Sequence, residues 1–147
     1  MKITICSIGE CMIEITNVEK ELYNYSVAGD TLNFTSYLDQ SIFNKFYLTA
    51  IGTSDINKGV ISFLKNKKIN TDLVKNIQSK EIGLYLIKNT KKGENQFYYW
   101  RDDSASKFFF NNMNKNLFIK KQRFDYIYLT GITLSLLDPK NIDKFIS

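Results

Sequence analysis

Three short apolar runs, each ending at a glycine, recur along this chain. They are Ile3 to Gly9, Phe46 to Gly52 and Tyr126 to Gly131. Their β-branched and aromatic residues predict buried strands. Because helical patterns lie between the runs, we expect strands to alternate with helices in a parallel α/β sheet.

Helical spacing of the apolar residues predicts a first helix from about Thr31 to Gln40. Phe34, Tyr37 and Leu38 would share its apolar face. Either Asp30 or Thr31 suits the N-cap, because both side chains can accept a hydrogen bond from a backbone N–H of the first turn.

A second helix is predicted from about Asn57 to Lys67, where Val60, Phe63 and Leu64 fall on one face. A last helix is expected from about Lys140, because the proline just before it suits the first turn of a helix.

Four further strand-like pieces do not fit this alternation. They are Cys11 to Thr16, Leu22 to Val27, Gly83 to Lys88 and Gln96 to Trp100. The segment from Asn89 to Glu94 has the glycine and polar content of a hairpin loop. We expect a small antiparallel sheet that projects from the main one and covers a pocket as a lid. The alternative is a pair of surface hairpins with no role.

Composition limits the chemistry that this chain can perform. Its 147 residues contain no histidine, which excludes Ser-His-Asp and Cys-His catalysis and argues against a zinc site. The only cysteines, Cys6 and Cys11, are too few and too unfavourably placed for a disulfide framework. No apolar run approaches the ~20 residues of a membrane span, and the short first run does not suit a signal peptide. We therefore expect a cytoplasmic protein with no membrane contact.

The formal net charge of +5 raises the question of nucleic-acid binding. The lysines are scattered and mixed with asparagine, which is typical of a solvated surface. We therefore expect no nucleic-acid partner, although the charge and the aromatic segment Phe97 to Arg101 leave an RNA-binding protein as an alternative.

Candidate binding chemistry lies in the segment Val27 to Phe34, which has the pattern of a strand end, a glycine turn and a helix start. Helix N-termini expose unpaired backbone N–H groups and favour anionic or hydroxyl-rich ligands. Together with Phe97 to Arg101, this segment suggests a pocket for a small acidic sugar.

Six motifs together resemble the N-terminal half of a carbohydrate kinase of the ribokinase/PfkB family. They are IGECMIE (8–14), AGDTLNF (28–34), YLTAIGTS (47–54), GLYLI (83–87), FYYWRDDSASKF (97–108) and FDYIYLTGITLSLL (124–137). Within that family the chain is most similar to the 2-keto-3-deoxygluconate kinases of the Entner–Doudoroff and uronate routes. The resemblance covers essentially the whole chain and preserves the order of the motifs.

This resemblance implies a truncated ribokinase-like three-layer α/β fold, with a parallel core sheet and a small β-sheet lid. Residues 1–147 would be the N-terminal part of one such domain, with lid strands at about 11–27 and 83–100. The C-terminal nucleotide-binding half would be absent. The whole enzyme would use ATP and Mg²⁺ to phosphorylate the C6 hydroxyl of 2-keto-3-deoxygluconate. Because lid sheets in this family often mediate dimers, we also expect a homo-oligomer that forms through the lid.

The resemblance also implies which residues bind the sugar acid. Gly29, Asp30 and Asn33 fall in the family's first sugar-binding motif, and Tyr85, Tyr99, Trp100 and Arg101 fall on the lid. A guanidinium can pair bidentately with a carboxylate, which favours the sugar-acid subgroup over fructokinase or ribokinase. The alternatives are lid packing for the tyrosines and a surface salt bridge between Arg101 and Asp102 or Asp103.

Two departures from the family pattern stand out. Ala28 replaces a glycine that is common in relatives, so its backbone should have an ordinary conformation. Nothing matches the family's Gly-Ala-Gly-Asp motif, which carries the catalytic base, and no Walker-type loop is present. We therefore expect no catalytic or nucleotide-binding residue in this chain. We also expect the chain by itself to have no kinase activity and to be poorly soluble. Two other functions stay open, a fructokinase-like kinase and a non-catalytic module for sugar-acid binding or oligomerisation.

Overall fold

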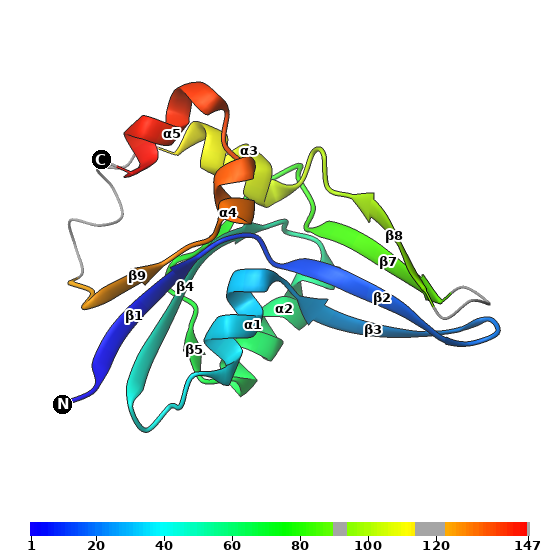
Figure 1. Cartoon of the computed structure of the whole chain (residues 1–147), viewed down its shortest axis with the longest axis horizontal. Coiled ribbons are helices and arrows are strands. Elements are labelled where there is room, and N and C mark those ends of the chain that lie inside the picture. The colour runs from blue at the N-terminus through cyan, green and yellow to red at the C-terminus, as the bar shows by residue number, and fades with distance from the viewer. Residues whose placement is uncertain (90–93, 114–122, 147) are drawn as a thin grey trace.

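The computed structural model of this protein describes residues 1–89, 94–113 and 123–146 and contains two sheets (Figure 1). The larger sheet has the strand order β5-β4-β1-β9, and β6 also pairs with β4. Its strands are β1 (Ile3–Ile8), β4 (Phe43–Ile51), β5 (Ile69–Asn70), β6 (Val74–Asn76) and β9 (Tyr126–Tyr128). Every described pairing within it is parallel, which confirms the predicted parallel α/β sheet.

Helices cover both faces of this sheet and give the predicted three layers (Figure 1). They are α1 (Asp30–Tyr37), α2 (Asp55–Asn66), α3 (Ala105–Asn112), α4 (Gly131–Ser135) and α5 (Pro139–Ile146). The protein has two apolar cores, one on each face of β4. Tyr47 and Ile51 pack in the core with α1 and α2, whereas Leu48 and Ala50 pack in the core with α3. Successive residues of a strand point to opposite faces, so a strand between two helical layers is apolar at consecutive positions.

The second and last predicted helices are confirmed. Val60 and Leu64 are fully buried on α2, and Phe63 packs partly against the same core. The last helix, α5, begins at Pro139, where the missing N–H of proline costs no helical hydrogen bond.

The apolar face predicted for the first helix is wrong. α1 buries Thr31, Leu32 and Thr35, whereas Tyr37 is 91% exposed. The threonines can be buried because they are hydrogen-bonded: Thr31 Oγ1 lies 3.0 Å from the Tyr47 hydroxyl, and Thr35 Oγ1 donates to the Thr31 carbonyl at 2.6 Å. The helix also ends earlier than predicted, because Leu38 is already extended.

The predicted N-cap is wrong as well. Gly29 occupies that position and makes no side-chain cap, and Asp30 begins the helix. Ala28 just before it has an ordinary backbone conformation, since the described non-glycine residues with positive φ lie elsewhere in the chain.

The second sheet projects from one end of the larger body (Figure 1) and is hereafter called the lid sheet. Its strands are β2 (Met12–Glu19), β3 (Leu22–Ala28), β7 (Gly83–Asn89) and β8 (Asn95–Trp100), in the order β3-β2-β7-β8. Residues 90–93 of the predicted hairpin loop lie outside the described residues.

The expectation of a wholly antiparallel lid is wrong at its centre. β2 pairs with β3 and β7 pairs with β8 in antiparallel hairpins, but β2 and β7 are parallel. Each hairpin leaves the body on its first strand and returns on its second. Because the two first strands are neighbours, they run in the same direction.

Both cysteines are buried and free, in agreement with the expectation of no disulfide. Burial raises the pKa of each thiol to about 12, so neither is a reactive thiolate at neutral pH. Among the described helices, none is both long and apolar enough to cross a membrane.

Candidate functional site

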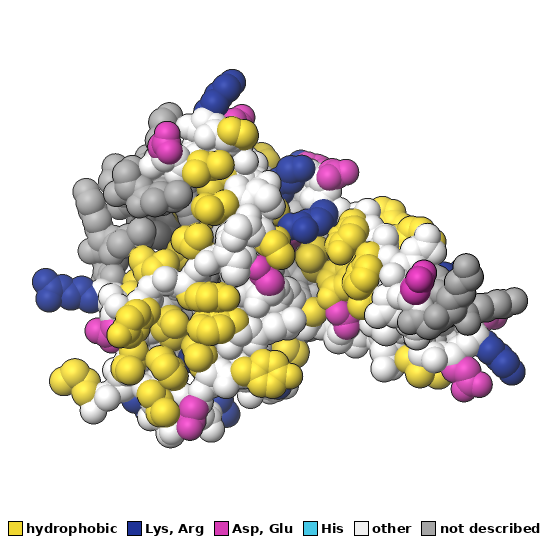
Figure 2. Space-filling view, viewed as in Figure 1, with side chains coloured by type: hydrophobic (Ala, Val, Ile, Leu, Met, Phe, Trp, Pro, Cys, Tyr) yellow, Lys and Arg dark blue, Asp and Glu magenta, His cyan; other side chains and the backbone are white. Residues whose placement is uncertain are grey.

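A cavity of about 280 Å³ lies where the lid sheet joins the larger body. Figure 2 shows hydrophobic side chains gathered over this junction. The cavity is lined by Glu10, Met12, Gly29, Asp30, Asn33, Tyr85, Phe97, Tyr99, Arg101 and Ile132. All the residues predicted to bind a ligand are therefore brought together, except Trp100.

The floor of the cavity is the start of α1. A Cβ atom at Gly29 would lie 2.5 Å from the Glu10 carbonyl oxygen, so only glycine allows the two backbone segments to approach this closely. Asp30 follows at the first helical position, where its carboxylate accepts a hydrogen bond from the Thr130 hydroxyl. One turn further along, Asn33 is exposed at the cavity with an amide that can both donate and accept.

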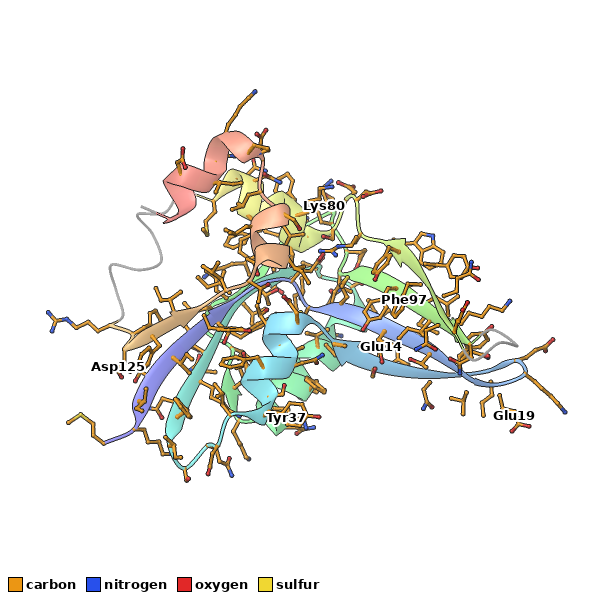
Figure 3. All side chains as sticks on the ribbon, in the orientation of Figure 1. Glu14, Glu19, Tyr37, Lys80, Phe97 and Asp125 are labelled. Atoms are coloured by element: carbon orange, nitrogen blue, oxygen red, sulfur yellow. The ribbon has the colours of Figure 1, made fainter. Side chains whose placement is uncertain are left out.

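Aromatic rings from the lid sheet form the opposite wall. Tyr85 on β7 pairs with Tyr99 on β8, and their ring centroids are 5.8 Å apart. Phe97 stacks on Tyr99, with their ring centroids 6.3 Å apart. Figure 3 shows Phe97 and Glu14 on the lid sheet. The wall can therefore pack against the carbon skeleton of a sugar.

The Tyr85 hydroxyl is a neutral donor. It donates a hydrogen bond to the Glu14 carboxylate. Burial raises the pKa of Tyr85 well above its ordinary value, and the bond to Glu14 raises it further. The hydroxyl therefore keeps its proton throughout the neutral range.

Trp100 does not line this cavity. Trp100 pairs with Leu84 across the β7–β8 hairpin, and this pair directly follows the pair of Tyr99 and Tyr85 along β8. Because successive strand residues face opposite sides of a sheet, Trp100 points to the outer face of the lid, where it is 59% exposed.

Arg101 brings the one cation of the lining. A guanidinium nitrogen of Arg101 lies 2.5 Å from Glu10 Oε2. The expected alternative partners of Arg101 are engaged elsewhere: Asp102 pairs with Lys107, and Asp103 pairs with Lys80.

Glu10 is the main functional candidate that the sequence did not assign. It is only 4% exposed, and its Oε1 accepts a hydrogen bond from the Ser104 hydroxyl at 2.5 Å. Desolvation raises the pKa of Glu10 and outweighs the Ser104 bond and the Arg101 charge, which lower it. The signal for Glu10 was its place at the end of β1, where ligand sites form in α/β sheets.

Two other lining residues, Met12 and Ile132, were not predicted, whereas Phe97 begins the segment Phe97 to Arg101 that the sequence assigned to the pocket. Phe97 follows from the alternation of β8, because it lies two residues before Tyr99. Met12 and Ile132 carry no chemical signal in the sequence. In the described ranges, no group of three or more His, Cys, Asp or Glu side chains could hold a metal ion.

The cavity combines an aromatic wall, hydroxyl-binding groups and one cation. Ligand sites are typically apolar clefts with a small number of well-placed polar groups. Chemically, Arg101 can pair with an anionic group of a ligand, and the polar groups at the start of α1 can hydrogen-bond hydroxyl groups.

Comparison with known proteins gives consistent results. Residues 2–146 match the pfkB family carbohydrate kinases. The chain is 32% identical over 148 residues to 2-dehydro-3-deoxygluconokinase of Escherichia coli K12, covering 97% of this chain and 48% of that protein. It is 35% identical over 147 residues to the protein of the same name from Haemophilus influenzae, covering 97% of this chain and 46% of the other.

The fold agrees with these relatives. A crystal structure of 2-dehydro-3-deoxygluconokinase from Thermotoga maritima matches with a TM-score of 0.76 and 15% identity, over 98% of this chain and 45% of that one. The chain thus spans about half the length of the relatives that it matches.

Proposed function

Because this chain belongs to the pfkB family of carbohydrate kinases, we propose that the whole protein phosphorylates 2-keto-3-deoxygluconate. The γ-phosphoryl group of ATP would pass to the C6 hydroxyl, with Mg²⁺ neutralising phosphate charge. The observation that supports this substrate most directly is the position of Arg101 among Tyr85, Tyr99 and Asn33 in one cavity.

Each lining residue has a role in this proposal. Arg101 pairs with the ligand carboxylate, which a neutral sugar lacks. Asn33, Asp30 and the backbone at Gly29 bind the hydroxyl groups, while Tyr85 and Tyr99 pack against the carbon chain. Closure of the lid sheet would exclude water from the reacting phosphate.

The nucleotide site and the catalytic base would lie outside these residues. Phosphoryl transfer needs groups that position the nucleophile and stabilise phosphate charge, and the described cavity holds one cation and no phosphate-binding loop. The 147-residue polypeptide by itself should therefore transfer no phosphate from ATP.

The test is an assay of the protein expressed from its complete natural reading frame, with ATP and Mg²⁺. We expect phosphorylation of 2-keto-3-deoxygluconate at C6, read by phosphorus NMR, and little reaction with fructose. Arg101→Lys should raise KM for the sugar acid about tenfold, because an ammonium cannot pair bidentately. The surface variant Lys58→Ala is the matched control. A preference for fructose would favour the fructokinase alternative, and binding without transfer would favour a non-catalytic module.

We also propose that the protein associates through the outer face of the lid sheet. Tyr25, Tyr98 and Trp100 are each more than a third exposed there, although they lie on the apolar face of the sheet. Exposed apolar patches of this kind mark interaction surfaces. Tyr98→Lys should convert the complete protein to a smaller species in sedimentation velocity, whereas Tyr126→Lys at the far edge of the body should not. An unchanged species with Tyr98→Lys would exclude the lid face.

A further inference from the structure

We propose that Glu10 is a positioning residue, which holds the Arg101 guanidinium at the cavity so that a ligand carboxylate is preferred over a neutral group. This inference rests on the sugar-acid function proposed above, and it names a determinant of that specificity outside the lid sheet.

The first support is the rigidity of Glu10. Its Oε1 accepts from the Ser104 hydroxyl, and the same hydroxyl oxygen accepts from the Lys107 backbone N–H at 3.2 Å as the N-cap of α3. The Ser104 backbone N–H in turn donates to the Arg101 carbonyl at 3.2 Å. Glu10 is therefore tied both to a helix cap and to the backbone of the residue whose side chain it contacts.

The second support is the space left for the pair. A Cβ atom at Gly83 would lie 2.9 Å from Glu10 Oε1 and 3.2 Å from Arg101 Cβ. Glycine at the start of β7 thus allows the carboxylate and the arginine to meet beside the cavity. A larger residue there would displace one of them.

The third support is the difference in burial between the partners. The Glu10 side chain is 2% exposed, whereas that of Arg101 is 23% exposed and lines the cavity. Glu10 therefore fixes one part of the guanidinium and leaves the remaining N–H groups available to a ligand. An arginine that is already ordered loses less conformational freedom on binding.

Charged groups on three neighbouring elements lie around the pair. Asp30 from α1 and Glu14 from β2 add negative charge near the cavity, and Lys107 from α3 adds positive charge near Glu10. Burial also raises the pKa of Glu10, so its carboxyl group takes up a proton more readily than an exposed one.

The experiment compares two ligands by calorimetry, on the protein from the complete reading frame. One is 2-keto-3-deoxygluconate, and the other is 3-deoxyfructose, in which a hydroxymethyl group replaces the carboxylate. The variants are Glu10→Ala, which removes the support, and Glu10→Gln, which keeps an oxygen that can contact Arg101. Asp102→Ala is the matched control, because its carboxylate adjoins Arg101 in sequence but pairs with Lys107.

We expect Glu10→Ala to weaken binding of the sugar acid about tenfold and binding of 3-deoxyfructose less than about twofold. Glu10→Gln should restore sugar-acid binding to within about threefold of the natural protein. Equal losses for both ligands, or no loss for either, would overturn the inference, as would a Glu10→Gln protein as weak as Glu10→Ala. A natural protein that does not prefer the sugar acid would instead refute the proposed function, before any variant is compared.

Discussion

The carboxyl group of Glu10 is buried, so its ionisation should affect stability. Its pKa in the folded protein is raised above its ordinary value of 4.5, with desolvation as the largest cause. The folded state therefore holds this proton more tightly than the unfolded state. The stabilisation is fully present below about pH 4.5 and is lost as the pH rises through the raised pKa.

We predict that Glu10→Gln is more stable than the natural protein at pH 8, by on the order of 1 kcal/mol, because it buries no charge. The advantage should shrink as the pH falls toward 4.5. Urea denaturation across this pH range measures both values.

Glu81 provides the control of opposite sign. It is exposed and accepts hydrogen bonds from the Ser54 hydroxyl and the Asn57 amide, which lower its pKa. Glu81→Gln should therefore lose stability at neutral pH and approach the natural protein as the pH falls through the lowered pKa. If Glu10→Gln and Glu81→Gln changed in the same direction, the assigned effect of burial on Glu10 would be wrong.

Single residues of the cavity were predictable to different degrees. Gly29, Tyr85 and Arg101 lie within motifs, so a resemblance located them without knowledge of their surroundings. The partner of Arg101 was not predictable, because Glu10 lies more than ninety positions away in sequence and meets it only when the lid is built. The orientation of Trp100 depends on the register of β8 against β7, which the motif does not contain.

At the scale of elements, the cap of α3 connects the core to the cavity. Ser104 caps this helix and also donates to the buried Glu10 carboxylate. We predict that Ser104→Ala lowers the free energy of unfolding by about 1–2 kcal/mol, through loss of the cap and a less satisfied buried carboxylate. Thermal or urea denaturation measures the change.

Ser62→Ala is the matched control for this substitution. Ser62 is exposed on α2, where its hydroxyl donates to the Lys58 carbonyl within the same helix. Its replacement should change stability by less than about 0.5 kcal/mol. Equal effects of the two substitutions would show that Ser104 contributes no more than an ordinary surface serine.

The buried face of a helix was predicted correctly where it consists of apolar residues, and wrongly where it consists of polar residues that are hydrogen-bonded. Val60 and Leu64 placed α2 correctly, since its buried face is apolar. α1 buries Thr31 and Thr35, whose hydroxyls are satisfied by Tyr47 and by the helix itself, and no hydrophobic pattern shows this. The parallel pairing of β2 with β7 was missed because it joins two hairpins that are distant in sequence.

At the scale of the whole molecule, the strands that the structure describes leave the β9 edge of the larger sheet unpaired. Among the described strands, β9 pairs only with β1. Its residues Tyr126 and Ile127 are 61% and 46% exposed, and hydrophobic side chains gather over this side of the body in Figure 2. An unpaired strand edge with apolar side chains is a template for association with another chain.

We therefore predict that the 147-residue polypeptide, purified by itself, forms species larger than the oligomer proposed to form through the lid sheet. Tyr126→Lys should remove these larger species in sedimentation velocity, because a lysine on an edge strand opposes strand addition. Tyr98→Lys should leave them in place while disrupting the contact proposed for the lid sheet. The two substitutions act at opposite ends of the molecule, so the result separates an interface of the lid from an open edge of the core. Persistence of the larger species in Tyr126→Lys, or their absence from the unmodified polypeptide, would mean that the β9 edge does not drive association.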